Sequence, residues 1–388
     1  MSNAKVTIEM FDTTLRDGAQ SLPEAKQFPA GAKPNIATKI ASLGIGVIEA
    51  GFPRTPGDGL EVADVAQTVG NTHFEAAVWQ DGDQINTVSR APIIAGLCRT
   101  TREDIEAGWN AVQPAMRPRI HTFISTDPEH MAAKFPGKSP DTVLAMGVDA
   151  VKYARRVMNG RRDGSVEFSA EAATTTDMAY LERVVKSVID HGVDIVNLPG
   201  TVDKRNPMWM YRFYAQALQW IAETNKNVVL SAHYHHDLGL STASSLMLVQ
   251  AAADHAERTG QEAKIQIETT ICGIGERAGN TDVFPVMACL FQFAKEMPVP
   301  IVWEFNPSRS YQIAREVMAY GNMEVHRQNP IVGDDINTHR SGIHSDGVIK
   351  GGFGIYTPQD PRFWGHPTDA RHEEGRYQGK AGRQHISK

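Results

Sequence analysis

Short apolar segments that end in polar residues recur along the first 280 residues of this chain, and helical patterns lie between them. A short apolar run bounded by turn signals is typical of a buried strand, and an amphipathic stretch behind it is typical of a crossover helix. The strand-like segments are residues 8–11, 47–53, 73–80, 119–126, 166–171, 194–201, 228–235 and 265–272, and the clearest amphipathic stretches are 31–43, 140–157, 177–192, 207–224 and 241–258.

Strand–helix units spaced about 30–40 residues apart predict an α/β fold with a parallel sheet. Eight such units favour a closed (β/α)8 TIM barrel over an open doubly wound sheet. After about residue 300 the pattern changes, because 308–323 looks helical and 329–388 is rich in Gly, Pro, His and charge. We therefore expect a barrel over residues 1–300 and a small helical accessory subdomain over 301–388.

Composition excludes several classes of protein. The net charge of −6 leaves no basic footprint for nucleic acid. The sequence has no apolar run of about 18 residues, and its N-terminus lacks an apolar signal segment, so we expect no membrane association. Its three cysteines, Cys98, Cys272 and Cys289, show no CxxC spacing. A reducing cytoplasm is the simplest expected compartment.

The sharpest local signal is His233-Tyr234-His235. Residues i and i+2 of a strand point to the same side, so two imidazoles at a strand end can hold one cation. With Asp17 from the first strand end, the set becomes two histidines and one carboxylate, which suits several divalent metals. The alternative is two hydrogen-bonded histidines in a polar barrel mouth. His236 falls on the opposite face and is not expected to be a ligand.

Other polar residues also follow predicted strands, where the active face of a barrel lies. Arg16 could stabilise negative charge on a reacting oxygen, or could simply pair with a carboxylate. Glu171 and His121 are candidate proton-transfer groups, although each alone is more often structural. The segment GIGERAGN at 273–280 offers Asn280 as a neutral oxygen ligand; it could equally be a helix-entry loop.

Seven motifs follow one another along the barrel region: DTTLRDG at 12–18, GFP at 51–53, HTFIST at 121–126, FSAE at 168–171, PGTV at 199–202, HYHHDLGL at 233–240 and GIGERAGN at 273–280. Together they resemble a metal-dependent family of acyl-CoA condensing enzymes and lyases built on TIM barrels. That family includes 2-isopropylmalate, citramalate and homocitrate synthases and HMG-CoA lyase.

Two later segments narrow the resemblance to the synthases. SGIHSDGVIK at 341–350 and YTPQDP at 356–361 are similar to a region that synthases carry and the lyase lacks. The likeness to 2-isopropylmalate synthases implies condensation of acetyl-CoA with 2-oxoisovalerate in leucine biosynthesis. Citramalate or homocitrate synthesis, and lyase-like cleavage, are the alternatives. GKAGRQH at 379–385 resembles the segment that leads into a regulatory domain in the family. The given sequence ends three residues later, and we expect no such domain here.

The resemblance also implies roles for individual residues. A divalent cation, Mn²⁺, Mg²⁺ or Zn²⁺, would hold the 2-oxo acid, and acetyl-CoA would be the second substrate. An arm in the accessory subdomain would reach the neighbouring active site of a swapped homodimer. The implied metal ligands are Asp17, His233, His235 and Asn280; the implied catalytic residues are Arg16, Glu171, His344 and Tyr356; and the implied substrate-binding residues are Gln20, His121, Ser169 and Thr201.

Four positions depart from the family pattern. Ala19 stands where Glu is usual, Gly200 replaces Asp, His236 replaces Asn or Asp, and Ser345 replaces Gln. None of these changes removes an implied metal ligand.

Overall fold

The computed structural model describes residues 3–202 and 204–372, and it divides into two compact units on either side of the Phe305–Asn306 bond. No helix among the described residues has both the length and the apolar character needed to cross a membrane.

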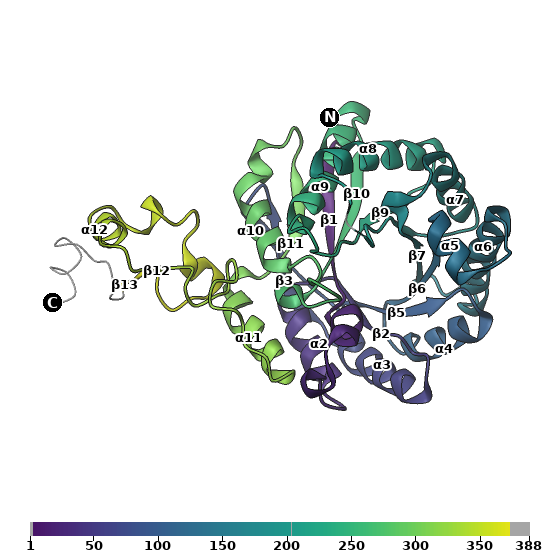
Figure 1. Ribbon diagram of the computed structural model, residues 1–388, viewed down its shortest axis with the longest axis horizontal. Helices are drawn as coiled ribbons and strands as arrows, with labels where there is room; N and C mark the ends of the chain where they lie inside the picture. Colours follow the sequence, from purple (N-terminus) through teal and green to yellow (C-terminus); the bar gives the residue numbers. More distant parts are fainter. Residues whose placement is uncertain (1–2, 203, 373–388) are drawn as a thin grey trace. The chain divides into compact units, whose positions relative to one another are not determined.

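The first unit contains a closed parallel barrel of eight strands, as the sequence predicts. Each strand pairs in parallel with the next, and β10 closes the ring by pairing with β1 from Lys5–Glu262 to Asp12–Thr269. Figure 1 shows the ring of strands with helices around it. In chain order the barrel strands are β1 (Lys5–Asp12), β2 (Val47–Gly51), β5 (Ile93–Arg99), β6 (Pro118–Ser125), β7 (Ser165–Glu171), β8 (Ile195–Asn197), β9 (Val229–Ala232) and β10 (Glu262–Thr269).

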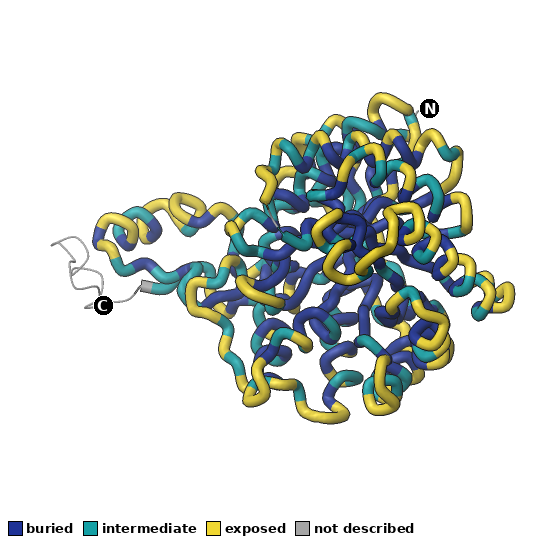
Figure 2. The backbone as a smooth tube through the Cα atoms, turned by 45° about the vertical axis from the view of Figure 1, so that its right-hand side comes forward, coloured by how far each residue is buried: buried dark blue, intermediate teal, exposed yellow. Residues whose placement is uncertain are grey.

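Helices cover the outside of these strands and bury their apolar faces against them (Figure 2). Several begin at a side chain that caps the free backbone N–H groups of the first turn, such as Thr55, Ser139 and Asp282. The main helices are α2 (Lys33–Ser42), α3 (Pro56–Thr68), α4 (Arg102–Val112), α5 (Pro128–Lys134), α6 (Pro140–Val157), α7 (Met178–Asp190), α8 (Pro207–Glu223), α9 (Ser241–Thr259) and α10 (Val283–Phe293).

The prediction of residues 73–80 as the third barrel strand is wrong. This segment forms β3 (Phe74–Gln80), which pairs antiparallel with β4 (Asp83–Arg90) and with β11 (Ile301–Glu304). The third barrel strand is β5, which is buried on both faces over six of its seven residues. Most of β3 is only half-buried. A barrel strand packs on both sides, so the continuous apolar run, rather than the more mixed one, enters the ring.

The second unit contains α11 (Ser310–Tyr320), α12 (Gly342–Gly351) and a pair of two-residue strands, β12 (Thr338–His339) and β13 (Arg371–His372). Within it, Arg315 pairs with Asp334 at 2.5 Å, and Asp334 also accepts a hydrogen bond from Tyr311 at 2.8 Å. The segment at 379–385 that resembles a lead-in to a regulatory domain lies outside the described residues.

Candidate active site

Asp17, His233 and His235 come together at the carboxyl ends of the barrel strands. Asp17 lies in a π-helical turn, Thr14–Gly18, directly after β1, and the two histidines directly follow β9. One ligand atom from each residue lies within 4.8 Å of the others, and all three residues are buried. His233 Nε2 is 3.7 Å from Asp17 Oδ2. The grouping expected from the sequence is therefore present in the fold.

Two buried polar atoms beside this cluster have no hydrogen-bond partner among the described residues. They are Asn280 Oδ1 and His235 Nδ1. Asn280 Nδ2 donates to Asp17 Oδ2 at 2.7 Å, so its amide lies against the cluster. A buried polar atom without a partner is costly. Carboxylate, amide and imidazole ligands suit a divalent cation, so these residues fit a metal ion.

The protonation states favour a cation at this point. Burial and the neighbouring His233 lower the pKa of His235 to about 4, which keeps its ring neutral near pH 7. Burial alone would raise the pKa of Asp17, but Arg16, His233 and the Asn280 amide outweigh burial and hold this pKa below its ordinary value. Asp17 is therefore ionised, and His235 can offer a lone pair.

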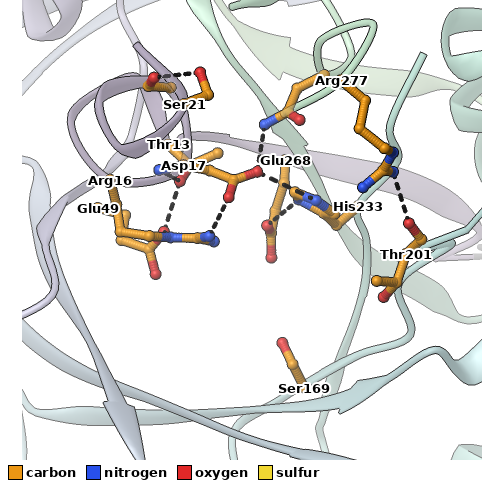
Figure 3. A network of polar contacts seen from close by, with 12 residues as sticks. Thr13, Arg16, Asp17, Ser21, Glu49, Ser169, Thr201, His233, Glu268 and Arg277 are labelled. Carbon is orange, nitrogen blue, oxygen red and sulfur yellow. Dashed lines mark hydrogen bonds and ion pairs between the residues drawn. The ribbon is translucent and has the colours of Figure 1, made fainter. Parts of the chain in front are cut away.

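A hydrogen bond to the ring nitrogen that faces away from Asp17 orients His233. Its Nδ1 lies 2.9 Å from Glu268 Oε2, which leaves Nε2 facing Asp17 (Figure 3). A carboxylate on the far nitrogen of a metal-binding histidine fixes the ring and its tautomer. Burial opposes a charged ring, but the Glu268 hydrogen bond and charge raise the pKa of His233. Positive charge is thus stabilised between the two carboxylates.

Arg16 is fixed by two carboxylates. Its Nη1 donates to Asp17 Oδ1 at 2.6 Å, and its Nε donates to Glu49 Oε2 at 2.5 Å. Glu49 is fully buried and also accepts from Thr13 Oγ1 at 2.6 Å and contacts His121 Nδ1 at 2.7 Å. Burial alone would raise the pKa of Glu49, but Arg16 and His121 lower it to about 2. Glu49 thus holds both Arg16 and His121 in place.

A cavity of about 170 Å³ opens over the cluster. Of the predicted site residues, Arg16, Asp17, His121, Ser169, Glu171, Thr201, His233 and His235 line it, together with Leu97, Phe123, Asn197, Pro199 and Glu268. Ser169 points toward the Asp17 side of the site (Figure 3). Its hydroxyl contacts His121 Nε2 at 2.6 Å and accepts from Asn197 Nδ2 at 2.9 Å.

Glu171 lies at the end of β7 with both carboxylate oxygens engaged. Lys134 Nζ is 2.6 Å from each oxygen, and Ser125 Oγ donates a further hydrogen bond. Gln20, in contrast, is exposed and lines a separate cavity of about 600 Å³ that shares Arg16 with the first. The structure therefore does not bring Gln20 into the cavity that contains Asp17.

His344 and Tyr356 belong to the second unit. Their rings stack within it, with centroids 4.0 Å apart and planes inclined by 15°. The two predicted catalytic residues of the second unit therefore lie next to one another. His236, predicted not to be a ligand, contacts Ser241 Oγ through Nδ1 at 2.6 Å.

Sequence reasoning missed Glu49, Asn197 and Glu268. All three lie inside barrel strands and are at most 2% exposed. The available signal was a lone Glu within an apolar run, in VIEAG and in IQIET, because a buried carboxylate requires a partner.

A second cluster of possible ligands lies deeper in the barrel. His121, Glu167 and Glu268 each offer an atom within 4.8 Å of the other two. These atoms already have protein partners: Arg119 Nη1 donates to Glu167 at 3.0 Å, and Asn197 Nδ2 donates to Glu268 at 2.6 Å. This group is a hydrogen-bonded support beneath the site.

The departure at Gly200 has a steric cause. A Cβ placed on Gly200 would lie 2.7 Å from Cδ1 and 3.0 Å from Cε1 of Tyr234, the residue between the two histidines. Tyr234 is fully buried and its hydroxyl donates to Tyr214. The tyrosine ring therefore occupies the space that a side chain at position 200 would need.

Gly200→Ala should lower the free energy of unfolding by about 1–3 kcal/mol, because the extra methyl group overpacks a buried site. The cost should shrink when Tyr234→Cys is present, since the smaller side chain frees the space. Urea unfolding of the two single variants and the double variant measures this coupling. Gly354→Ala, where a Cβ meets nothing within 4 Å, is the control. Equal cost of Gly200→Ala in both backgrounds would contradict the explanation.

Comparison with known proteins gives consistent matches. The sequence profile of the HMGL-like family matches residues 7–301. A 2-isopropylmalate synthase of Heliobacterium modesticaldum is 36% identical over 344 residues, which is 88% of this chain and 59% of that protein. A probable 2-isopropylmalate synthase of Glycine max is 35% identical over 94% of this chain and 59% of its own length. The chain thus spans about 60% of these relatives.

Solved structures match at the level of fold. An HMG-CoA lyase from Brucella melitensis has a TM-score of 0.54 at 15% identity, covering 83% of this chain and 98% of that one. The carboxyl transferase domain of Rhizobium etli pyruvate carboxylase, solved with pyruvate, has a TM-score of 0.52 at 12% identity over 84% and 49% of the two chains. Since the family profile covers most of the chain and the barrel carries the expected cluster, this chain belongs to the HMGL-like family.

Proposed function

We propose that this protein is a metal-dependent acyltransferase that condenses acetyl-CoA with a 2-oxo acid, 2-oxoisovalerate, and hydrolyses the thioester with one water molecule to give 2-isopropylmalate and CoA. The observation that carries the proposal is the buried group of Asp17, His233, His235 and Asn280, with two atoms that lack a protein partner. The names of the 34–36% identical relatives support the choice of reaction. The proposal places the protein in leucine biosynthesis.

Each residue has a role that follows from its position. When bound by Asp17, His233, His235 and Asn280, a divalent cation supplies Lewis-acid polarisation of the keto group. Arg16 places a guanidinium where the keto oxygen becomes negative during carbon–carbon bond formation. Thr201, His121 and Ser169 orient the 2-oxo acid by hydrogen bonds from the cavity wall.

Glu171 is the proposed base that removes a proton from the acetyl methyl group. Its position at the end of β7, in the cavity lining, supports that role. We propose that His344 and Tyr356 from the second unit of a partner copy complete the proton transfers, and that the protein is a cytoplasmic homodimer. Residues 1–300 would then be catalytic, and residues 301–388 would supply the neighbouring site.

The cavity wall favours an aliphatic 2-oxo acid. Leu97, Phe123 and Pro199 are its apolar lining residues, and Arg16 is the only lysine or arginine among the lining residues described. Arg16 is paired with Asp17 and Glu49 and is assigned to the keto oxygen, so this lining offers no further lysine or arginine for a second substrate carboxylate. This argues against 2-oxoglutarate as the substrate.

A thiol-release assay tests the function. Purified protein with Mn²⁺ and acetyl-CoA should release free CoA thiol fastest with 2-oxoisovalerate, more slowly with pyruvate and least with 2-oxoglutarate. Asp17→Asn, which removes a charged ligand, should abolish the signal, and added EDTA should do the same. Absence of thiol release with all three acids would overturn the proposal. Cleavage of a hydroxyacyl-CoA without condensation would replace it with a lyase.

A further inference from the structure

The loop between β10 and α10 contains an arginine that the proposed reaction does not use. Arg277 Nε donates to Asp237 Oδ1 and Oδ2 at 3.0 and 3.1 Å, and its Nη2 donates to Oδ2 at 2.8 Å. The same Nη2 donates to the main-chain oxygen of Thr201 at 2.9 Å, a contact drawn in Figure 3. One guanidinium therefore joins the loops that follow β8, β9 and β10.

Each joined loop carries a residue of the proposed site. Thr201 lies on the first, Asp237 follows His235 by two residues on the second, and Arg277 precedes Asn280 by three residues on the third. The second and third loops also meet through an antiparallel bridge between His235 and Asn280. The distance between these two loops therefore sets the distance between the candidate ligands His235 and Asn280.

The backbone of Arg277 is held in a conformation that side chains disfavour. Its φ of 57° lies in the left-handed region. Such a conformation persists where surrounding contacts over-determine it. The Arg277 side chain is 46% exposed, so simple charge attraction to Asp237 contributes little. The forked geometry of the guanidinium, which a lysine cannot reproduce, fixes the three loops together.

We propose that Arg277 and Asp237 form a rim clamp, defined as this ion pair with its bond to the Thr201 carbonyl oxygen, which sets the affinity of the candidate centre for its divalent cation. Arg277 is a positioning residue, because it acts through His235 and Asn280. The inference rests on the metal site of the proposed function and does not depend on which 2-oxo acid is used.

The test measures binding of Mn²⁺ alone by calorimetry, after EDTA treatment and dialysis. Arg277→Lys and Asp237→Asn should each weaken Mn²⁺ binding on the order of 10- to 100-fold, as loss of outer-shell support does at other metal sites. The double variant should be no weaker than the worse single variant, because both changes open the same clamp. Independent structural damage would instead multiply the two losses.

Arg99→Lys is the matched control. Arg99 also makes a two-pronged pair, with Asp104 at 2.6 and 3.0 Å, at the end of a barrel strand, and it is equally exposed. This variant should bind Mn²⁺ like the wild type. Urea unfolding of the metal-free proteins runs in parallel, and if Arg277→Lys does not fold, Asp237→Asn decides the outcome.

The possible failures can be distinguished. A wild-type protein that binds no Mn²⁺ would overturn the proposed metal-dependent function itself. A wild-type protein that binds Mn²⁺, with single variants that bind equally well or whose losses multiply in the double variant, would overturn the clamp alone.

Discussion

Gly275→Ala should remove most of the affinity of this protein for divalent cations. A Cβ on Gly275 would lie 2.4 Å from Asn280 Oδ1 and 2.5 Å from Asn280 Cγ. Real Cβ contacts are not this short, so the Asn280 amide must leave the position in which its Nδ2 donates to Asp17 Oδ2. The amide oxygen, which has no protein partner, is displaced with it. We expect Mn²⁺ binding to weaken on the order of 100-fold, with activity falling in parallel at limiting metal.

Gly59→Ala is the control for this variant. Gly59 lies in α3, where the nearest atom to an added Cβ is Pro53 Cβ at 4.0 Å, so alanine fits without displacement. Calorimetric titration with Mn²⁺ and unfolding of the metal-free proteins separate lost affinity from lost folding. If Gly275→Ala binds Mn²⁺ as tightly as the wild type, Asn280 is not a ligand.

Glu49→Gln should be strongly destabilising at pH 7. The glutamate is fully buried and is one of the two carboxylates that compensate the charge of Arg16, so its neutralisation leaves only Asp17 to balance that charge. Removing one partner of a buried ion pair costs about 3–5 kcal/mol. Urea unfolding in EDTA measures this cost without a contribution from metal. Loss of Arg16 orientation should also reduce turnover.

The pH dependence of the same variant provides a second measurement. The pKa of Glu49 is lowered to about 2 from an ordinary 4.5. Its ionised form therefore contributes stability that is fully present above pH 4.5 and is lost as the pH falls towards 2. This contribution is about 3 kcal/mol, and Glu49→Gln should lack it. The wild-type and variant proteins should thus converge in stability in acid.

Glu167→Gln is the matched control, since Glu167 is equally buried in the barrel but has the opposite shift. Burial, only partly offset by His121 and Arg119, raises its pKa to about 7. Its protonated form is favoured in the folded protein, so the wild type loses stability as pH rises from 4.5 through 7, and Glu167→Gln does not. If Glu49→Gln cost no more than Glu167→Gln at pH 7, the assigned role of Glu49 would be wrong.

The sequence was informative wherever a pattern has a single physical solution. Repeated apolar runs with polar exits and helices between them predict a parallel sheet, for which eight units favour closure into a barrel. Two histidines at i and i+2 after a strand lie close together. The segment 73–80 was wrongly predicted as a barrel strand because the strands of a hairpin and those of a barrel contain the same β-forming residue types. Only packing on both faces, visible in β5, separates them.

The supporting residues could not be placed in the same way. Glu49 contacts Arg16 and His121, and Glu268 contacts His233, across separations that depend on which strands are neighbours. Asn280 was predicted as a neutral oxygen ligand in a glycine-rich loop, but the close approach of Gly275 to its amide depends on how that loop folds. Such pairings follow from tertiary geometry, which local pattern does not encode.

Closure of the ring between β1 and β10 has a consequence for synthesis on the ribosome. β1 is synthesised first, but one of its two edges stays unpaired until β10, near the end of the first unit, has been synthesised. An unpaired edge of this kind invites association with other nascent chains. The carboxylate near the start of the chain meets its imidazole partners equally late, so the candidate metal site is complete only after most of the first unit has been synthesised.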